Sequence, residues 1–331
     1  MILSKTPLRM SYVGGGSDLP AFYREELGAV LSTSIDKYMY IAVNEKFDGN
    51  IRLSYSKTEE VDCVSDIQHP LVREALDLVS IEGGIEIASM ADIPSKGSGL
   101  GSSSSYTVGL LNALYAYKNR YVSKETLAQQ ACEIEINRCK EPIGKQDQYA
   151  AAFGGLNLIR FHADESVSVD PVICKPEVIQ QVEDSTLVFF TGRTRSASAV
   201  LQNQSEAMKL ENSRVLMRRM VTLAFELKKE LEAGDIDNFG SILDENWKLK
   251  AQLTNGITDP QIDDWYQRGI RYGAKGGKLL GAGNGGFIMF FAPPESHQRI
   301  KDALIELRPI KFGFDRTGAQ IAFYGYKKES I

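Results

Sequence analysis

Three glycine-rich segments carry the side chains whose types and spacing could support chemistry. The first spans residues 6–18, where a strand-like stretch containing Arg9 leads into Gly14-Gly15-Gly16 and then Ser17 and Asp18. Glycine lets the backbone approach a ligand closely, and the serine and aspartate oxygens can accept hydrogen bonds from hydroxyl groups. The segment is therefore a candidate for binding a hydroxylated ligand, although a tight turn followed by a helix cap explains the same residues.

The second segment, residues 93–105, predicts a phosphate-binding loop. It contains Gly97, Gly99 and Gly101, continues into four serines, and leads directly into an apolar segment with helical character. Successive backbone N–H groups at a helix N-terminus are suited to holding phosphate oxygens. The spacing differs from a Walker A loop and from the Rossmann fingerprint. A flexible serine linker is the alternative, but a linker is not expected between an apolar strand and an apolar helix.

The third segment, residues 273–286, holds seven glycines and precedes the apolar run 287–291. Small residues here would let one strand pack closely on another segment, and a simple hairpin turn explains them equally well. Between the second and third segments, Asp147 stands near the start of an apolar helix-like stretch. It is either an ordinary residue of a helix N-terminus or a positioned base, and the first interpretation is favoured when the stretch is taken alone.

Composition excludes several classes of protein. The chain has 38 Lys and Arg against 43 Asp and Glu, a net charge of −5, which argues against a globally basic nucleic-acid binder. No apolar run approaches the roughly 18 to 20 residues that span a bilayer, and the N-terminus lacks a signal-peptide core, so a cytoplasmic location is expected. Four scattered cysteines and three scattered histidines argue against a zinc site or a disulfide framework. Acid–base chemistry then falls to carboxylates, lysine or arginine.

The elements that must position these residues are mixed without a regular βα alternation, which predicts an α+β fold. The length favours two domains, with a boundary between about residues 165 and 185. Expected strands are 8–12, 38–43, 51–55, 85–90, 156–161, 167–169, 187–190, 274–280, 287–291, 311–314 and 319–324. Expected helices are 71–79, 103–117, 124–137, about 196–233, 237–253 and 296–307.

The three segments, in this order and with Asp147 between the second and third, resemble the GHMP kinase superfamily. The Gly-Gly-Gly-Ser-Asp motif, with the surroundings of Arg9 and Asp147, is most similar to the D-glycero-D-manno-heptose 7-phosphate kinases. The resemblance implies an N-terminal ATP-binding domain (1–175) like domain 2 of ribosomal protein S5 and a ferredoxin-like C-terminal domain (176–331). It also implies an ATP-dependent sugar kinase that phosphorylates an anomeric hydroxyl. The alternatives are another sugar 1-kinase of the fucose or galactose type, a kinase of a non-sugar alcohol such as homoserine or mevalonate, and a non-catalytic small-molecule sensor.

The resemblance also assigns roles to residues. Asp147 would accept the proton of the attacking hydroxyl, with Arg9 beside it, and Ser103 and Glu135 would hold Mg²⁺. ATP phosphates are expected on Lys96, Gly97, Ser98, Gly99, Leu100, Gly101, Ser102, Ser103 and Ser104. The substrate is expected on Arg9, Asp147, Gly15, Gly16, Ser17, Asp18 and Gly283, with Arg193 and Arg195 as candidates for a distal phosphate. The alternative for this segment is that Thr194 and Ser196 cap the next helix. The expected partners are ATP and a sugar or sugar phosphate, without nucleic acid or membrane, in a monomer or homodimer.

Overall fold

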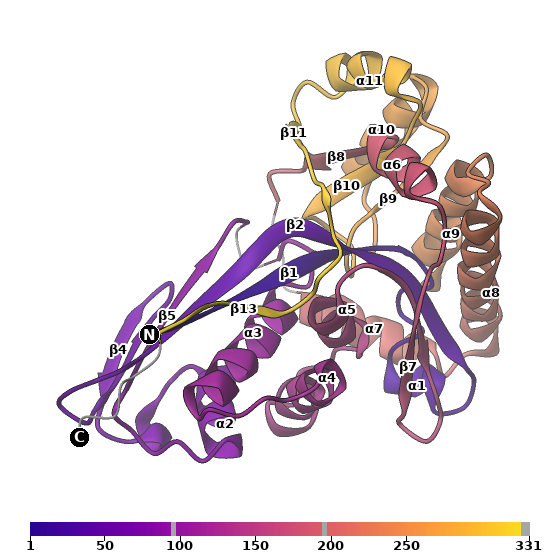
Figure 1. The fold of residues 1–331 in the computed structure, drawn as a ribbon. Coiled ribbons are helices and arrows are strands. Elements are labelled where there is room, and N and C mark those ends of the chain that lie inside the picture. The colour runs from indigo at the N-terminus through magenta and orange to yellow at the C-terminus, as the bar shows by residue number, and fades with distance from the viewer. Residues whose placement is uncertain (94–96, 194–196, 326–331) are drawn as a thin grey trace.

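The computed structural model describes residues 1–93, 97–193 and 197–325, which build two β-sheets with helices packed on them (Figure 1). The first sheet is organised around two long antiparallel strands, β1 (Ile2–Val13) and β2 (Gly28–Glu45). Its main path runs β13-β1-β2-β5-β3-β4, and β6 and β12 also pair with β2. The remaining strands are β3 (Ile51–Ser54), β4 (Thr58–Val61), β5 (Ile85–Ala91), β6 (Leu156–Phe161), β7 (Val167–Pro171), β12 (Phe314–Asp315) and β13 (Gln320–Tyr324).

Helices α2 to α5 lie along one side of this sheet (Figure 1). The helix α3 is the most enclosed of them, because most of its first fourteen residues are buried. The helices of this part are α1 (Pro20–Tyr23), α2 (Pro70–Leu78), α3 (Ser102–Tyr117), α4 (Lys124–Cys132) and α5 (Gln146–Phe153), with a 3₁₀ turn at Val64–Asp66 and a π-helical segment at Glu133–Arg138. The glycine-rich second segment therefore ends where a buried helix begins, as the sequence predicts.

The second sheet has the strand order β11-β8-β10-β9, with every neighbouring pair antiparallel. In chain order these strands run fourth, first, third, second, which is the ferredoxin-like arrangement and confirms that expectation. The strands are β8 (Thr186–Phe190), β9 (Gly276–Leu279), β10 (Phe287–Phe291) and β11 (Arg308–Ile310). The helices are α6 (Pro176–Asp184), α7 (Ala197–Ala207), α8 (Glu211–Ala233), α9 (Phe239–Leu253), α10 (Pro260–Arg271) and α11 (His297–Ala303), with a 3₁₀ turn at Pro294–Ser296.

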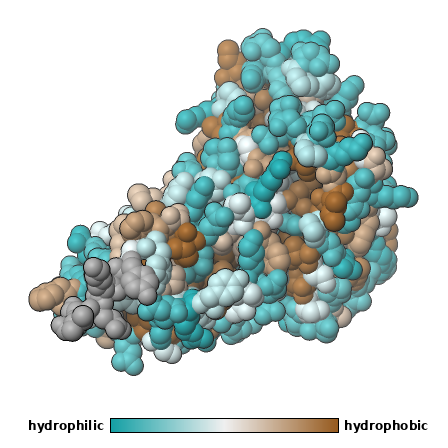
Figure 2. All heavy atoms as spheres, viewed as in Figure 1, coloured by the Kyte–Doolittle hydropathy of each residue, from teal (hydrophilic) through white to brown (hydrophobic). Residues whose placement is uncertain are grey.

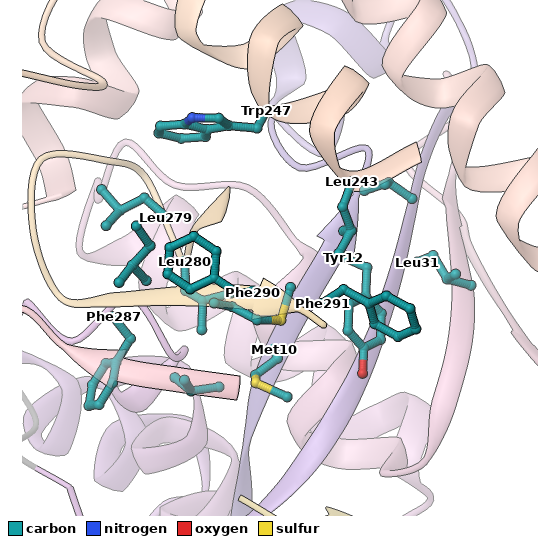
Figure 3. Close-up of a cluster of buried hydrophobic side chains, with 14 of the residues drawn as sticks. Met10, Tyr12, Leu31, Leu243, Trp247, Leu279, Leu280, Phe287, Phe290 and Phe291 are labelled. Atoms are coloured by element: carbon teal, nitrogen blue, oxygen red, sulfur yellow. The ribbon is translucent and has the colours of Figure 1, made fainter. Parts of the chain in front are cut away.

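One hydrophobic cluster joins the two sheets (Figure 3). Tyr12 of β1 packs edge-on against Phe239 of α9, with ring centroids 5.1 Å apart, and Phe239 stacks on Phe291 of β10 at 4.4 Å. The shared core fixes α9 and the third glycine segment relative to β1. The division at residue 175 stays a prediction, and β12 and β13 return from the far end of the chain to pair with the first sheet.

Several helical stretches differ from the sequence expectation. A single helix was expected over 196–233, but the structure has two helices, α7 and α8, with a break that begins at Met208. Met208 is buried, and Arg214 near the start of α8 forms an ion pair with Glu26. Tertiary contacts thus override the continuous periodicity. The helices α6 and α10 were not expected, although each begins with a proline at its first position, which is a helix-start signal.

The surface visible in Figure 2 is mostly hydrophilic, with hydrophobic residues in small groups. Within the described residues, no helix has the length and apolarity needed to cross a membrane.

Candidate active site

The three glycine segments meet around one cavity of about 610 Å³. Its wall includes Gly15 and Gly16 from the first segment, residues 97–99 and 101–104 from the second, and Gly281 and Ala282 from the third. Six charged side chains line it as well: Arg9, Asp18, Glu141, Asp147, Lys250 and Lys278. Residues far apart in the sequence therefore share one cavity, and the loop predicted to bind phosphate and the loop predicted to bind hydroxyls both line it.

The second segment is clamped between β1 and the third segment. The Arg9 backbone N–H donates to the Leu100 carbonyl at 3.0 Å. A Cβ on Gly99, whose φ is +75°, would lie 2.4 Å from the Leu280 carbonyl oxygen, so only glycine fits there. Gly101 has φ +74° and immediately precedes α3. This clamp presents the helix N-terminus, with Ser102, Ser103 and Ser104, to the cavity.

Arg9 and Asp147 form an ion pair at the cavity wall. The Arg9 Nε and Nη2 atoms donate to Asp147 Oδ1 at 2.8 and 2.6 Å, and Nη1 donates to the Gly99 carbonyl at 2.6 Å. Arg9 is 5% exposed and Asp147 is 24% exposed. The second carboxylate oxygen, Oδ2, accepts no hydrogen bond from the part of the chain that the structure describes. One oxygen is therefore fixed by the arginine, while the other can accept a hydrogen bond from a ligand.

Asp18 is a second carboxylate at the cavity, and it is buried. It accepts hydrogen bonds from the Gly16 and Gln146 N–H groups at 3.0 and 3.3 Å and from Gln146 Nε2 at 3.0 Å. Burial raises the pKa of Asp18, the charge of Asp147 adds to the rise, and the backbone donors oppose it. The loop before α5 packs closely on it, because a Cβ on Gly144 would lie 1.9 Å from Asp18 Oδ2. Asp18 and the start of α5 are thus held as one unit.

Glu135 lies behind the serines of α3, in the π-helical segment, and is fully buried. Its carboxylate accepts hydrogen bonds from Ser103 Oγ at 2.9 Å, Ser104 Oγ at 2.8 Å and Gln148 Nε2 at 2.5 Å. Burial raises the pKa of Glu135 to about 7, although these three donors lower it. The carboxylate is therefore buried without a direct cationic partner among the described residues, and a hydroxyl beside a carboxylate is an oxygen pair that fits Mg²⁺.

Two buried lysines complete the cavity, and the sequence did not single them out for this position. Lys278 is 1% exposed and donates to the Ser11 and Tyr12 carbonyls at 2.7 and 2.9 Å. Lys250 of α9 is 4% exposed and donates to the Gly281 carbonyl at 2.8 Å. Lys250 stands three residues after Trp247 on the apolar face of its helix. A lysine on such a face was the signal available in the sequence.

Some predicted residues lie elsewhere. The Arg193 side chain pairs with Asp259 at 2.7 Å and covers the Trp265 ring, and it does not line the cavity. The Ser17 hydroxyl donates within its own loop to the Gly14 carbonyl, and Gly283 packs on the Ile257 backbone. Leu100 is fully buried and contributes only its backbone. Lys96, Thr194, Arg195 and Ser196 are outside the described residues.

A glycine loop at a helix N-terminus, an arginine-bound aspartate and a buried Ser–Glu pair are together suited to phosphoryl transfer. The profile of the GHMP kinases N-terminal domain matches residues 68–155, and that of the GHMP kinases C-terminal domain matches residues 227–308. The chain belongs to the GHMP kinases, and it is an ATP-dependent kinase.

Individual relatives share most of the chain. A D-glycero-alpha-D-manno-heptose 7-phosphate kinase from Campylobacter jejuni is 30% identical over 92% of this chain and 93% of that protein. A galactokinase from Pyrococcus furiosus is 25% identical over 95% of both. Among solved structures, a D-glycero-D-manno-heptose 1-phosphate kinase from Bacteroides thetaiotaomicron superposes with a TM-score of 0.81 at 26% identity, covering 99% of this chain and all of that one.

Proposed function

We propose that this protein is a sugar 1-kinase that transfers the γ-phosphate of ATP to the anomeric hydroxyl of a D-glycero-D-manno-heptose 7-phosphate. The similarity to the Campylobacter jejuni enzyme over nearly the whole chain supports the substrate class. The observation that carries the proposal is the Asp147 carboxylate, bound by Arg9 on one oxygen and open to the cavity on the other. A polar cavity wall containing Ser11, Asp18 and Gln146 suits a polyhydroxylated acceptor better than an isoprenoid alcohol.

The nucleotide phosphates would lie on the backbone N–H groups of residues 97–104 at the N-terminus of α3. The partial positive charge of the helix end stabilises phosphate oxygens there without a basic surface. This explains how a chain with a net charge of −5 can bind a nucleoside triphosphate. Ser103 and Glu135 would hold Mg²⁺, which neutralises charge on the β- and γ-phosphates when it is bound.

Asp147 Oδ2 would accept the proton of the attacking hydroxyl. The oxygen of that hydroxyl forms a bond to the γ-phosphorus while the bond between the γ-phosphorus and the ADP oxygen breaks. Arg9 orients Asp147 through Oδ1, and its guanidinium adds positive charge where negative charge accumulates in the transition state. Asp18 would bind acceptor hydroxyls and so orient the reacting one. Arg195 remains the prediction for the distal phosphate, because Arg193 is paired with Asp259 away from the cavity.

A screen of ADP release tests the proposal. The purified chain is supplied with Mg²⁺, ATP and one acceptor at a time: heptose 7-phosphate, the free heptose, fucose, galactose, mevalonate and homoserine. The expected result is the highest kcat/KM with the heptose 7-phosphate, with the new phosphate on the anomeric carbon by ³¹P NMR. A higher kcat/KM with fucose or galactose would contradict the heptose assignment, and ADP release with none of them would favour the sensor alternative.

A further inference from the structure

Three polar side chains from separate elements converge above Gly15. A Cβ built on this glycine would lie 3.4 Å from Ser11 Oγ, 3.8 Å from Gln146 Nε2 and 3.9 Å from Lys250 Nζ. Ser11 belongs to β1, Gln146 begins α5 and Lys250 belongs to α9, and all three line the 610 Å³ cavity. The absence of a side chain at Gly15 thus leaves space that three polar groups surround.

These groups have hydrogen-bonding capacity that the described chain does not use. Ser11 Oγ and Gln146 Oε1 are buried and have no partner within residues 1–93, 97–193 and 197–325. The Lys250 ammonium carries three hydrogens, and a single bond, to the Gly281 carbonyl, is made to the described residues. A buried polar group without a partner lowers the stability of the folded chain. Several of them around one space indicate a ligand that pairs with them.

The charges around Lys250 select the kind of ligand. Arg9 from β1, Lys278 from β9, Asp18 from the first glycine loop and Asp147 from α5 all face the same cavity. Asp18 is the carboxylate whose charge acts most strongly on Lys250, and it would repel a phosphate placed beside the ammonium. Lys250 donates, Asp18 accepts, and Ser11 and Gln146 can do both. Hydroxyl groups, which donate and accept at once, match this set.

We propose that Ser11, Gln146 and Lys250 form a subsite above Gly15 that binds ring hydroxyls of the acceptor, and that Lys250 is its main specificity-determining residue. The proposal rests on the proposed sugar-kinase function and deepens it. Gln146 directly precedes Asp147 and also binds Asp18. The hydroxyls bound above Gly15 are therefore those close to the reacting one, and their capture by Lys250 orients the attack.

The test is the Lys250→Met variant, which keeps the length of the side chain and removes its charge and its donors. Lys248→Met is the matched control, because Lys248 lies on the same helix, is 62% exposed and pairs with Asp244. Lys250→Met is expected to raise the acceptor KM at least tenfold and to change the ATP KM less than threefold, while Lys248→Met changes neither. An acceptor KM within twofold of wild type would overturn the proposal. An equal rise in both KM values would assign Lys250 to the nucleotide and overturn it as well.

Monodeoxy analogues of the acceptor sharpen the test. The analogue that lacks the hydroxyl bound by Lys250 should bind wild type and Lys250→Met with the same affinity, because the hydrogen-bond partner of the Lys250 ammonium is already missing. If every analogue shows the full loss, Lys250 does not bind a ring hydroxyl.

Ser11→Ala keeps the proposal testable if Lys250→Met does not fold. Since Ser11 Oγ bonds to no described residue, its removal should leave the unfolding temperature unchanged and raise the acceptor KM roughly threefold to tenfold. An unchanged acceptor KM would reject the subsite. If none of the tested sugars leads wild type to release ADP, the proposed function fails. Calorimetric binding of the same sugars to wild type and to Ser11→Ala then decides the subsite separately.

Discussion

Asp147→Asn is the substitution that most directly tests the chemistry. Asparagine is nearly isosteric, so its amide oxygen can keep both hydrogen bonds from Arg9 that now reach Oδ1. The amide NH₂ then takes the place of Oδ2 at the cavity. An acceptor that faces the substrate hydroxyl becomes a donor, and the group can no longer take up a proton.

The magnitude follows from this geometry. Loss of a general base costs a factor of about 10² to 10⁴ in kcat, which corresponds to roughly 3 to 5 kcal/mol of transition-state free energy. ATP affinity should change little, because the N–H groups of residues 97–104 are untouched. Stability should fall by about 1 to 2 kcal/mol, because two charge-assisted bonds of the buried Arg9 become bonds to a neutral oxygen.

The assay combines steady-state kinetics, calorimetric titration with ATP and urea unfolding. Asp170→Asn is the matched control, because Asp170 pairs with Arg160 at 2.7 Å on the surface, away from the cavity. It should leave kcat unchanged and cost at most about 1 kcal/mol of stability. A folded Asp147→Asn variant with kcat within threefold of wild type would refute the general-base role. A comparable loss of kcat in Asp170→Asn would show that the assay reports ion-pair loss in general.

Three further results are expected. Ser103→Ala should raise the Mg²⁺ concentration for half-maximal activity roughly tenfold, because it removes a hydroxyl beside Glu135. An unaltered Mg²⁺ titration would exclude Ser103 from the metal site. Arg193→Ala should leave the KM of free and phosphorylated sugars unchanged. It should lower the free energy of unfolding by at most about 1 kcal/mol, because it breaks the partly exposed ion pair with Asp259. A KM rise confined to the phosphorylated sugar would contradict this prediction. Burial lowers the pKa of Lys250 to about 8, so the ammonium loses its proton as the pH rises through that value. The kcat/KM for the acceptor should therefore fall around this pH in wild type but not in Lys250→Met. The same fall in both proteins would place the titration on another group.

Much of the fold and of the candidate site could be predicted from the sequence because the relevant signals are local. Glycines at 97, 99 and 101 before an apolar helix predict a phosphate-binding loop through backbone conformation and helix polarity, and neither depends on distant residues. The two helices opened by Pro176 and Pro260 carried local signals as well, but neither was expected. The break between α7 and α8 at Met208 had no local signal in the sequence. It depends on the burial of Met208 and on the ion pair of Arg214 in α8 with Glu26, which follows α1 in the chain.

The sequence by itself determined the family-level architecture and the residue types available for phosphoryl transfer, because motif order, glycine content and apolar periodicity are properties of the chain. Only the tertiary structure decided which side chains share the cavity. Arg9 and Asp147 are 138 residues apart, and their contact exists because β1 and α5 pack on one another. Lys250 reaches the cavity because the core around Tyr12 and Phe239 docks α9 beside the first glycine loop, whereas Arg193 is drawn away to Asp259. Such juxtapositions depend on distances in space that the order of residues does not encode locally.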